Sequence, residues 1–146
     1  MRTLNKGFTM IELVVVITIL ATLAAFAIPR FTALDSRARI SALTALGGSL
    51  RSASALAHAQ YLVTGSSPAS LTMDGATVTL VNGYPDVAGI QSALQDTTGF
   101  TPTATATSVT FAKNGAPTSA NCSVRYTISA AANTAPVIAA PETSGC

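Results

Sequence analysis

A long apolar run near the start of the chain constrains its fold more than any other feature. The run extends from Ile11 to Ile28, and Glu12 is its only charged residue. A membrane-spanning helix needs about 17 to 25 mostly apolar residues. The sequence therefore predicts an N-terminal helix long enough to cross a bilayer.

Glu12 is unusual because it lies at the edge of this run. A carboxylate at mid-membrane depth costs about 2.5–3.5 kcal/mol, so an ionisable residue in such a segment is a candidate for function. The alternative interpretation is an acid at the start of a helix, where the helix dipole favours negative charge. The flanking sequence bears on this choice.

A short basic segment, residues 1–7, precedes the run and ends in Gly7. A secretory signal has a cleavage site of small residues after its apolar core. Here the run continues directly into Pro29, and no such site follows it. Gly7 is the only small residue at the boundary between the polar and apolar segments. Cleavage between Gly7 and Phe8 would keep the apolar run as the mature N-terminus.

Residues 6–13, with the sequence KGFTMIEL, resemble the processing signature of type IV pilins and the related pseudopilins. The shared pattern is a short basic leader, Gly before the cut, Phe after it and Glu four residues further on. The resemblance implies that a prepilin peptidase cuts after Gly7 and methylates the new amine of Phe8. It also implies that Glu12 helps to dock each subunit onto the fibre. Met10 replaces the common Leu, which is a volume-conserving exchange.

A second resemblance lies further along the chain. Residues 82–85, with the sequence NGYP, and the two distal cysteines are similar to mannose-sensitive haemagglutinin-type major pilins of the type IVa group. The fold expected from the whole sequence is α+β, with one long N-terminal helix packed on a small, roughly four-stranded antiparallel sheet. The expected parts are a leader, a hydrophobic membrane or filament-core helix, an amphipathic half of the same helix and a globular β domain, at residues 1–7, 8–30, 31–62 and 63–146.

Pro29 is expected to break this helix. Proline removes one backbone donor and clashes with the carbonyl four residues back, that of Ala25. Residues 21–29 should therefore kink or locally unwind. Similar pilins lose helical order in this segment when they are packed in a fibre.

The second half of the helix carries an apolar stripe that can pack on a sheet. The stripe consists of Leu43, Leu46, Leu50, Ala53 and Ala57. Gly47 and Gly48 indicate either a weak helical turn or a close approach of helices in a fibre core. His58, the only histidine, falls on the polar face, where it is expected to be solvated or hydrogen-bonded.

Turn residues and alternating patterns divide the distal part into short elements. A hairpin is predicted over residues 71–81, with Asp74-Gly75 as its turn, and is followed by a loop at 82–85. Asp86 is expected to cap a short helix that ends near Gln95. Residues 101–108 show no regular pattern. Strands are predicted at 108–112, 122–129 and, as an edge strand, 137–140.

Two cysteines, Cys122 and Cys146, enclose residues 123–145. A tail that ends in cysteine has to be held in place, so we predict a disulfide; two reduced, buried thiols are the alternative. In the chain-entropy model, closing a loop of this size contributes roughly 3.5 kcal/mol. A persistent disulfide needs an oxidising compartment such as the periplasm. It would place the distal domain outside the cytoplasm, which the charges flanking the run leave open.

Charge and motif content argue against several classes of function. Loss of Arg2 and Lys6 with the leader leaves six basic against six acidic residues (8 − 2 = 6). After Arg51 two basic residues face four acidic ones, so no nucleic-acid partner is expected. The sequence has no phosphate-binding loop, dinucleotide motif or zinc spacing. We expect neither an enzyme nor a cofactor or metal site.

The sequence favours the structural subunit of a type IV pilus that serves adhesion, twitching or surface attachment. Its expected partners are copies of itself, the prepilin peptidase, the pilus assembly machinery and, before assembly, the inner membrane. The precursor would reside in that membrane with its distal domain periplasmic, and the filament would be extracellular. Alternatives are a pseudopilin of a type II secretion system or a minor DNA-uptake pilin.

Overall fold

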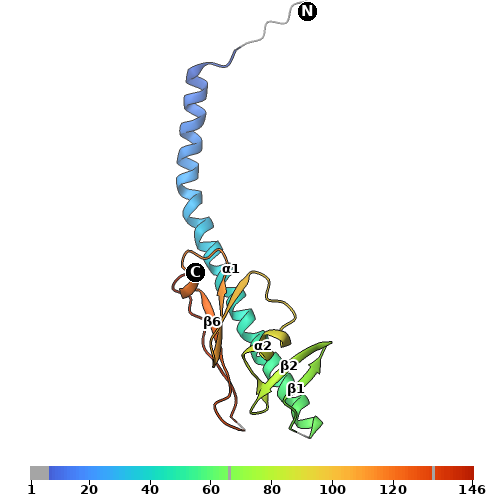
Figure 1. Ribbon diagram of the computed structural model, residues 1–146. Coiled ribbons are helices and arrows are strands. Elements are labelled where there is room, and N and C mark those ends of the chain that lie inside the picture. Colours follow the sequence, from blue (N-terminus) through green and yellow to red (C-terminus); the bar gives the residue numbers. More distant parts are fainter. Residues whose placement is uncertain (1–6, 66, 133) are drawn as a thin grey trace, which may run out of the picture. The chain divides into compact units, whose positions relative to one another are not determined.

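The computed structural model describes residues 7–65, 67–132 and 134–146 (Figure 1). Arg2 and Lys6 of the expected leader lie outside this part, as does Ser66 of the predicted loop after the helix. The chain forms two compact units, residues 1–36 and 37–146. Helix α1 (Met10–Thr64) contributes to both, and each unit is described by itself.

In the first unit, α1 is continuously helical and its apolar side chains are exposed. Its threonines turn their hydroxyls back onto the helix: Thr18 Oγ1 donates to the carbonyl oxygens of Val14 and Val15 at 3.0 and 2.8 Å. The helix continues through Pro29 in this single chain. A kink or loss of helix at residues 21–29 in a packed state stays a prediction.

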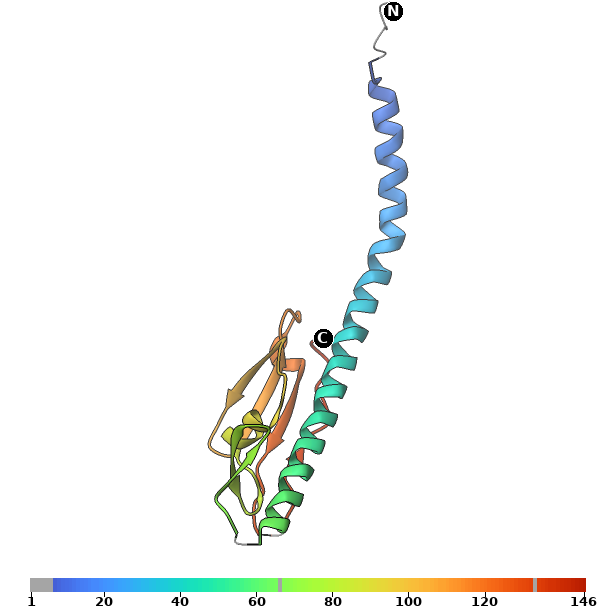
Figure 2. The same ribbon diagram turned by 90° about the vertical axis from the view of Figure 1, so that its right-hand side faces the viewer.

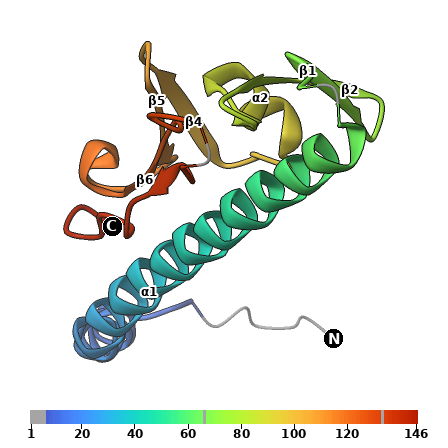
Figure 3. The ribbon, with the colours of Figure 1, turned by 90° about the horizontal axis from the view of Figure 1, so that it is seen from below.

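In the second unit, α1 packs on two antiparallel sheets through one apolar face (Figure 3). Most of the predicted stripe is confirmed, because Leu43, Leu46, Leu50 and Ala57 are buried and Ala53 is partly buried. Sequence reasoning missed two smaller residues that are also buried in this face, Gly47 and Ser54.

The first sheet contains β1 (Ser70–Met73), β2 (Ala76–Val81) and β3 (Tyr84–Pro85), in that order. The predicted Asp74-Gly75 turn joins β1 to β2, and both turn residues have positive φ, 49° and 80°. Asn82-Gly83 repeats this geometry with φ of 55° and 83°. The prediction of a loop at residues 82–85 is therefore wrong. The second turn folds Tyr84 and Pro85 back onto β2 as a short strand.

Helix α2 (Val87–Ala93) begins where the sequence predicts. Asp86 Oδ1 caps it by accepting from the backbone N–H of Gly89 and from Thr79 Oγ1, both at 2.6 Å. The helix ends before Leu94, which is already extended, rather than near Gln95. Gly89 is needed for close packing on β2, because a Cβ there would lie 2.0 Å from the carbonyl oxygen of Thr79.

The second sheet contains β4, β5, β6 and β7, in that order (Figure 2). Their bounds are Phe100–Ala104, Ser108–Lys113, Ser123–Thr127 and Val137–Ile138. A 3-10 turn, Ser119–Asn121, precedes β6. The strands predicted at 108–112, 122–129 and 137–140 are confirmed, the last two with shorter bounds. The expectation of no regular structure at 101–108 is wrong, because β4 pairs with β5 along its whole length.

A buried hydrogen bond joins the two sheets. Tyr126, in β6, is fully buried, and its hydroxyl donates to the carbonyl oxygen of Pro85 in β3 at 2.7 Å. Burial raises the pKa of the Tyr126 phenol to about 12, with a smaller opposing contribution from a hydrogen bond with Ser54. The folded state therefore favours the neutral, protonated form of Tyr126.

Gly89→Ala should destabilise the chain by about 3 kcal/mol, because the added methyl group meets the backbone of β2 and overpacks the contact. Gly48→Ala is the matched control. A Cβ at Gly48 meets no atom within 4 Å, so this change should raise stability by up to about 1 kcal/mol through helix propensity. Urea denaturation of the detergent-solubilised chain measures both effects. Equal effects of the two changes would contradict this packing.

Tyr126→Phe should cost about 1–3 kcal/mol, because it leaves the buried carbonyl oxygen of Pro85 without its donor. Tyr61→Phe is the control and should change stability little, since the Tyr61 ring rather than its hydroxyl contacts Gly83. The Tyr126 pKa is raised in the folded state, so its contribution is complete below pH 10 and is lost as pH rises towards 12. The difference between the absorbance titrations of the unchanged chain and of Tyr126→Phe should show one phenol that ionises near pH 12; a difference step near pH 10 in a folded chain would contradict this.

Candidate functional site

The start of α1 forms a capping box between Thr9 and Glu12. Glu12 Oε2 accepts hydrogen bonds from the backbone N–H of Thr9 at 3.0 Å and from its hydroxyl at 2.7 Å. Thr9 Oγ1 in turn accepts from the backbone N–H of Glu12 at 3.3 Å. The carboxylate is thereby fixed at the first turn of the helix, where the dipole favours its charge.

The structure brings Phe8 and Glu12 together. Both line one hollow of about 380 Å³ on the surface of the helix, together with Ile11, Val15 and Val16. Gly7 is exposed and precedes the helix, and a Cβ there would meet no atom within 4 Å. The peptide bond between Gly7 and Phe8, where cleavage is predicted, therefore lies in an uncrowded backbone segment just before the turn that carries Glu12.

The surface beyond this hollow is apolar. Helix α1 is the only described helix long and apolar enough to cross a membrane, with a mean hydropathy of 2.6 in its most apolar window, none of which is buried. Its large exposed side chains include Phe26 at 80% and Phe31 at 71%. Water does not favour so much exposed apolar surface, which marks the segment as an interaction surface.

The predicted disulfide between Cys122 and Cys146 is confirmed. Both cysteines are buried, and the guanidinium of Arg39 donates to the carbonyl oxygen of Cys146 at 2.7 Å. Gly145 packs closely against Thr118. A Cβ at this position would lie 2.3 Å from the carbonyl oxygen of Thr118, so only glycine fits here. These contacts fix the last residues of the chain against both α1 and the 3-10 turn.

His58 was expected to be solvated or hydrogen-bonded, and the structure shows it hydrogen-bonded. It also takes part in a contact that the sequence did not reveal. Its Nδ1 lies 2.8 Å from the carbonyl oxygen of Gly83, so this nitrogen carries the proton. Its ring stacks on Tyr84 with centroids 4.0 Å apart and on Tyr61 at 6.0 Å. The cluster holds the Asn82-Gly83 turn on α1. No sequence pattern connects a helical histidine to a tyrosine in a distant turn.

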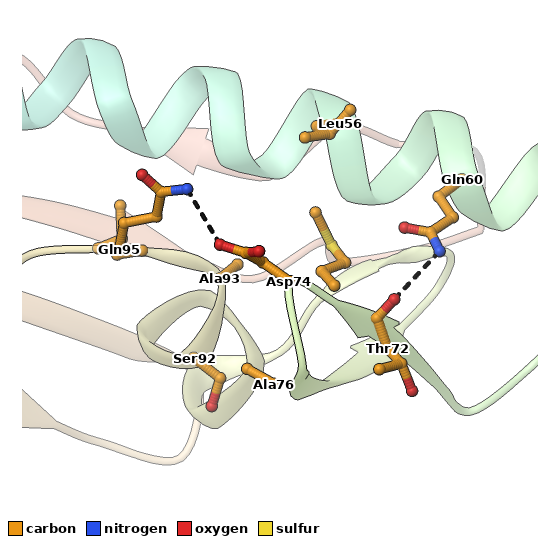
Figure 4. A pocket seen from close by; sticks show the side chains of 10 residues that line it. Leu56, Gln60, Thr72, Asp74, Ala76, Ser92, Ala93 and Gln95 are labelled. Carbon is orange, nitrogen blue, oxygen red and sulfur yellow. Dashed lines mark hydrogen bonds between the residues drawn. The ribbon is translucent and has the colours of Figure 1, made fainter.

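A groove of about 750 Å³ lies between α1, α2 and the β1–β2 hairpin (Figure 4). Two side-chain amides bridge its walls: Gln95 Nε2 donates to Asp74 Oδ2 at 3.3 Å, and Gln60 Nε2 donates to the carbonyl oxygen of Thr72 at 3.2 Å. Its lining contains no histidine, cysteine or lysine.

Comparison with known proteins gives matches to the N-terminal part of the chain. Residues 2–28 match a family model described as the prokaryotic N-terminal methylation motif. The chain is 42% identical over 53 residues to a type IV major fimbrial protein, FimA, of Dichelobacter nodosus. It is 46% identical over 55 residues to a type IV narrow pilus major component, PilA5, of Thermus thermophilus. No solved structure gives a significant match.

These matches cover only part of each protein. The two alignments include 36% and 38% of this chain, and 34% and 47% of the respective relatives. The residues matched by the family model, 2–28, contain the capping box and the apolar run. The chain therefore carries the methylation motif in residues 2–28 and is similar in part to type IV major pilins, in agreement with the resemblance in residues 6–13.

Proposed function

We propose that this chain is the structural subunit of a type IV pilus filament, serving adhesion, twitching or surface attachment. The observation that carries the proposal is the methylation motif at the start of a helix whose apolar side chains are exposed. The relatives that share this segment are major components of type IV pili or fimbriae. The role of the distal domain is assembly and display rather than catalysis.

Processing is the first step of this function. A prepilin peptidase cuts between Gly7 and Phe8 and methylates the amine of Phe8. The open backbone at Gly7 and the methylation motif support this step. The leader, residues 1–7, is lost. Residues 8–30 then become the mature N-terminal segment, first in the inner membrane and later in the filament core.

Docking onto the fibre uses the charge of Glu12. The two hydrogen bonds that the Glu12 carboxylate accepts from Thr9 both fall on Oε2, and Oε1 accepts no hydrogen bond from the part of the chain that the structure describes. Oε1 can therefore accept the cationic amine of Phe8, from the same or a neighbouring subunit. Isolated charges are very costly in an apolar filament core, so pairing would satisfy both and set the axial register.

The compartment follows from the disulfide. An oxidised Cys122–Cys146 pair supports a periplasmic position of residues 63–146 while residues 8–30 lie in the inner membrane. Assembly then moves the N-terminal helix from lipid into contact with helices of other copies, and the distal domain becomes extracellular. The amphipathic half of α1, residues 31–62, links the two parts.

Glu12→Gln tests the docking role. Glutamine keeps the acceptor that a capping box needs but removes the charge. We expect the leader to be cleaved normally, while sheared fibres fall about tenfold or more, because an unpaired buried amine costs more than the ~1.4 kcal/mol that a factor of ten represents. Immunoblots of membranes and of sheared material measure the two steps.

Glu142→Gln is the matched control, because it removes one negative charge from an exposed position in the distal unit. It should leave both cleavage and fibre yield unchanged. Normal fibres from Glu12→Gln would refute the proposed role of the charge. A block in cleavage rather than in fibre formation would move Glu12 from docking to processing.

A further inference from the structure

The chain contains two asparagine–glycine pairs, Asn82-Gly83 and Asn114-Gly115, and the structure holds them differently. In such a pair the backbone nitrogen of the glycine can attack the side-chain amide carbon of the asparagine. Glycine permits this reaction because it has no side chain in the way and adopts many backbone conformations. The surrounding structure then decides whether the two groups are free to react.

The first pair is restrained by contacts with three other segments. Asn82 Nδ2, which would have to leave, donates to the carbonyl oxygen of Ser129 at 3.1 Å. The carbonyl oxygen of Gly83 lies 2.8 Å from His58 Nδ1, and Gly83 is buried against the ring of Tyr61. The reaction would require this turn to open, which costs free energy. Attack at Asn82 is therefore disfavoured in the folded chain.

The second pair is open to solvent. Asn114 and Gly115 form an exposed turn directly after β5. Neither Asn114 Nδ2 nor the backbone N–H of Gly115 makes a hydrogen bond with the described residues. Gly115 has a φ of 73°, and a Cβ there would meet no atom within 4 Å. A base from solvent can therefore reach the N–H, and the side-chain nitrogen can leave.

The side-chain oxygen of Asn114 already has a hydrogen-bond donor. Thr101 Oγ1 donates to Asn114 Oδ1 at 2.7 Å. This oxygen becomes negatively charged when a nucleophile attacks the amide carbon, and a donor that is in place beforehand stabilises such a charge. Lys113 Nζ and the backbone N–H of Asn114 both donate to the carbonyl oxygen of Gly99, each at 3.0 Å. A cation therefore lies beside the turn, which also favours negative charge there.

We propose that Asn114 is a site of spontaneous deamidation, in which Gly115 supplies the nucleophile and Thr101 the donor to the oxyanion. The products are aspartate and isoaspartate. Either product adds one negative charge, so that five acidic residues instead of four would face two basic ones after Arg51. Isoaspartate also lengthens the main chain by one methylene group at the end of β5. The inference goes beyond the proposed function and does not depend on polymerisation.

The reaction needs only water and hydroxide. Hydroxide removes the proton from the Gly115 nitrogen, which then forms a bond to Cγ of Asn114 while the carbonyl electron pair moves to Oδ1. When this pair returns, the bond from Cγ to Nδ2 breaks, and the nitrogen leaves with the electron pair and takes a proton from water to become ammonia. Water then opens the cyclic succinimide. Addition of water at Cγ gives aspartate, and addition at the main-chain carbonyl carbon gives isoaspartate.

A time course on the full chain in detergent, in alkaline water labelled with heavy oxygen, tests the proposal. Peptide mass spectrometry then identifies residues hydrolysed during the incubation, because they carry the label. In the folded chain we expect Asn114 to convert about tenfold faster than Asn82 or more, because opening the Asn82 turn breaks its hydrogen bonds.

The same chain, reduced and unfolded in urea, is the matched control. There the two pairs should convert at similar rates, because the contacts that distinguish them are lost. Equal rates in the folded chain, or a faster reaction at Asn82, would overturn the proposal. A preference for Asn114 that persists unchanged in urea would also overturn it, because the local sequence rather than the fold would then select the site.

Thr101→Val tests the donor, since valine keeps the β-branched shape but has no hydroxyl. It should slow the conversion of Asn114 in the folded chain about two- to tenfold, the range expected for one lost hydrogen bond. Thr103→Val is the control, because the exposed hydroxyl of Thr103 makes no hydrogen bond with the described residues. An unchanged or faster reaction in Thr101→Val, or equal slowing in both variants, would refute the assigned role.

Discussion

The large apolar side chains in the N-terminal part of α1 are exposed, and the rest of the structure depends on this constraint. Apolar surface gains about 25 cal/mol for each Å² removed from water, so a long exposed apolar helix requires lipid or other copies of itself. The polar residues of the segment are arranged accordingly. Thr18 and Thr22 return their hydroxyls to helix carbonyls, and Glu12 stays at the first turn.

The distal unit, residues 37–146, forms its own core although the chain has little charge and few aromatic residues. One face of α1 supplies Leu43, Leu46 and Leu50 to the core, and the two sheets are joined through Tyr126 and Pro85. The disulfide and the Arg39 contact hold the last residues in place. Such a closed unit suits a domain that is carried from the membrane to the outside of a filament.

Local chemistry made much of the fold predictable from the sequence. The spacing of the leucines predicts the buried stripe of α1. Asp74-Gly75 predicts the turn of the first hairpin, and the alternating pattern after Cys122 predicts strand β6. The failures share a cause, because β3 and β4 depend on distant partners. Tyr84 and Pro85 form a strand by pairing with β2, and residues 100–104 form a strand by pairing with β5. Gly89 likewise depends on a distant partner, because its missing side chain permits close contact with Thr79 in another element. At the candidate site, residues 6–13 identified Gly7, Phe8 and Glu12, while the role of Thr9 emerged only from side-chain geometry.

The central claim is that the apolar helix survives processing and becomes the interior of a filament. The most direct measurement is the N-terminus of the mature chain in material sheared from the cell surface, determined by mass spectrometry of its first peptide. The account predicts a chain that begins with N-methylated Phe8 and retains the run up to Pro29. A mature chain that begins after Pro29 would contradict it, because no filament could then be built on this helix.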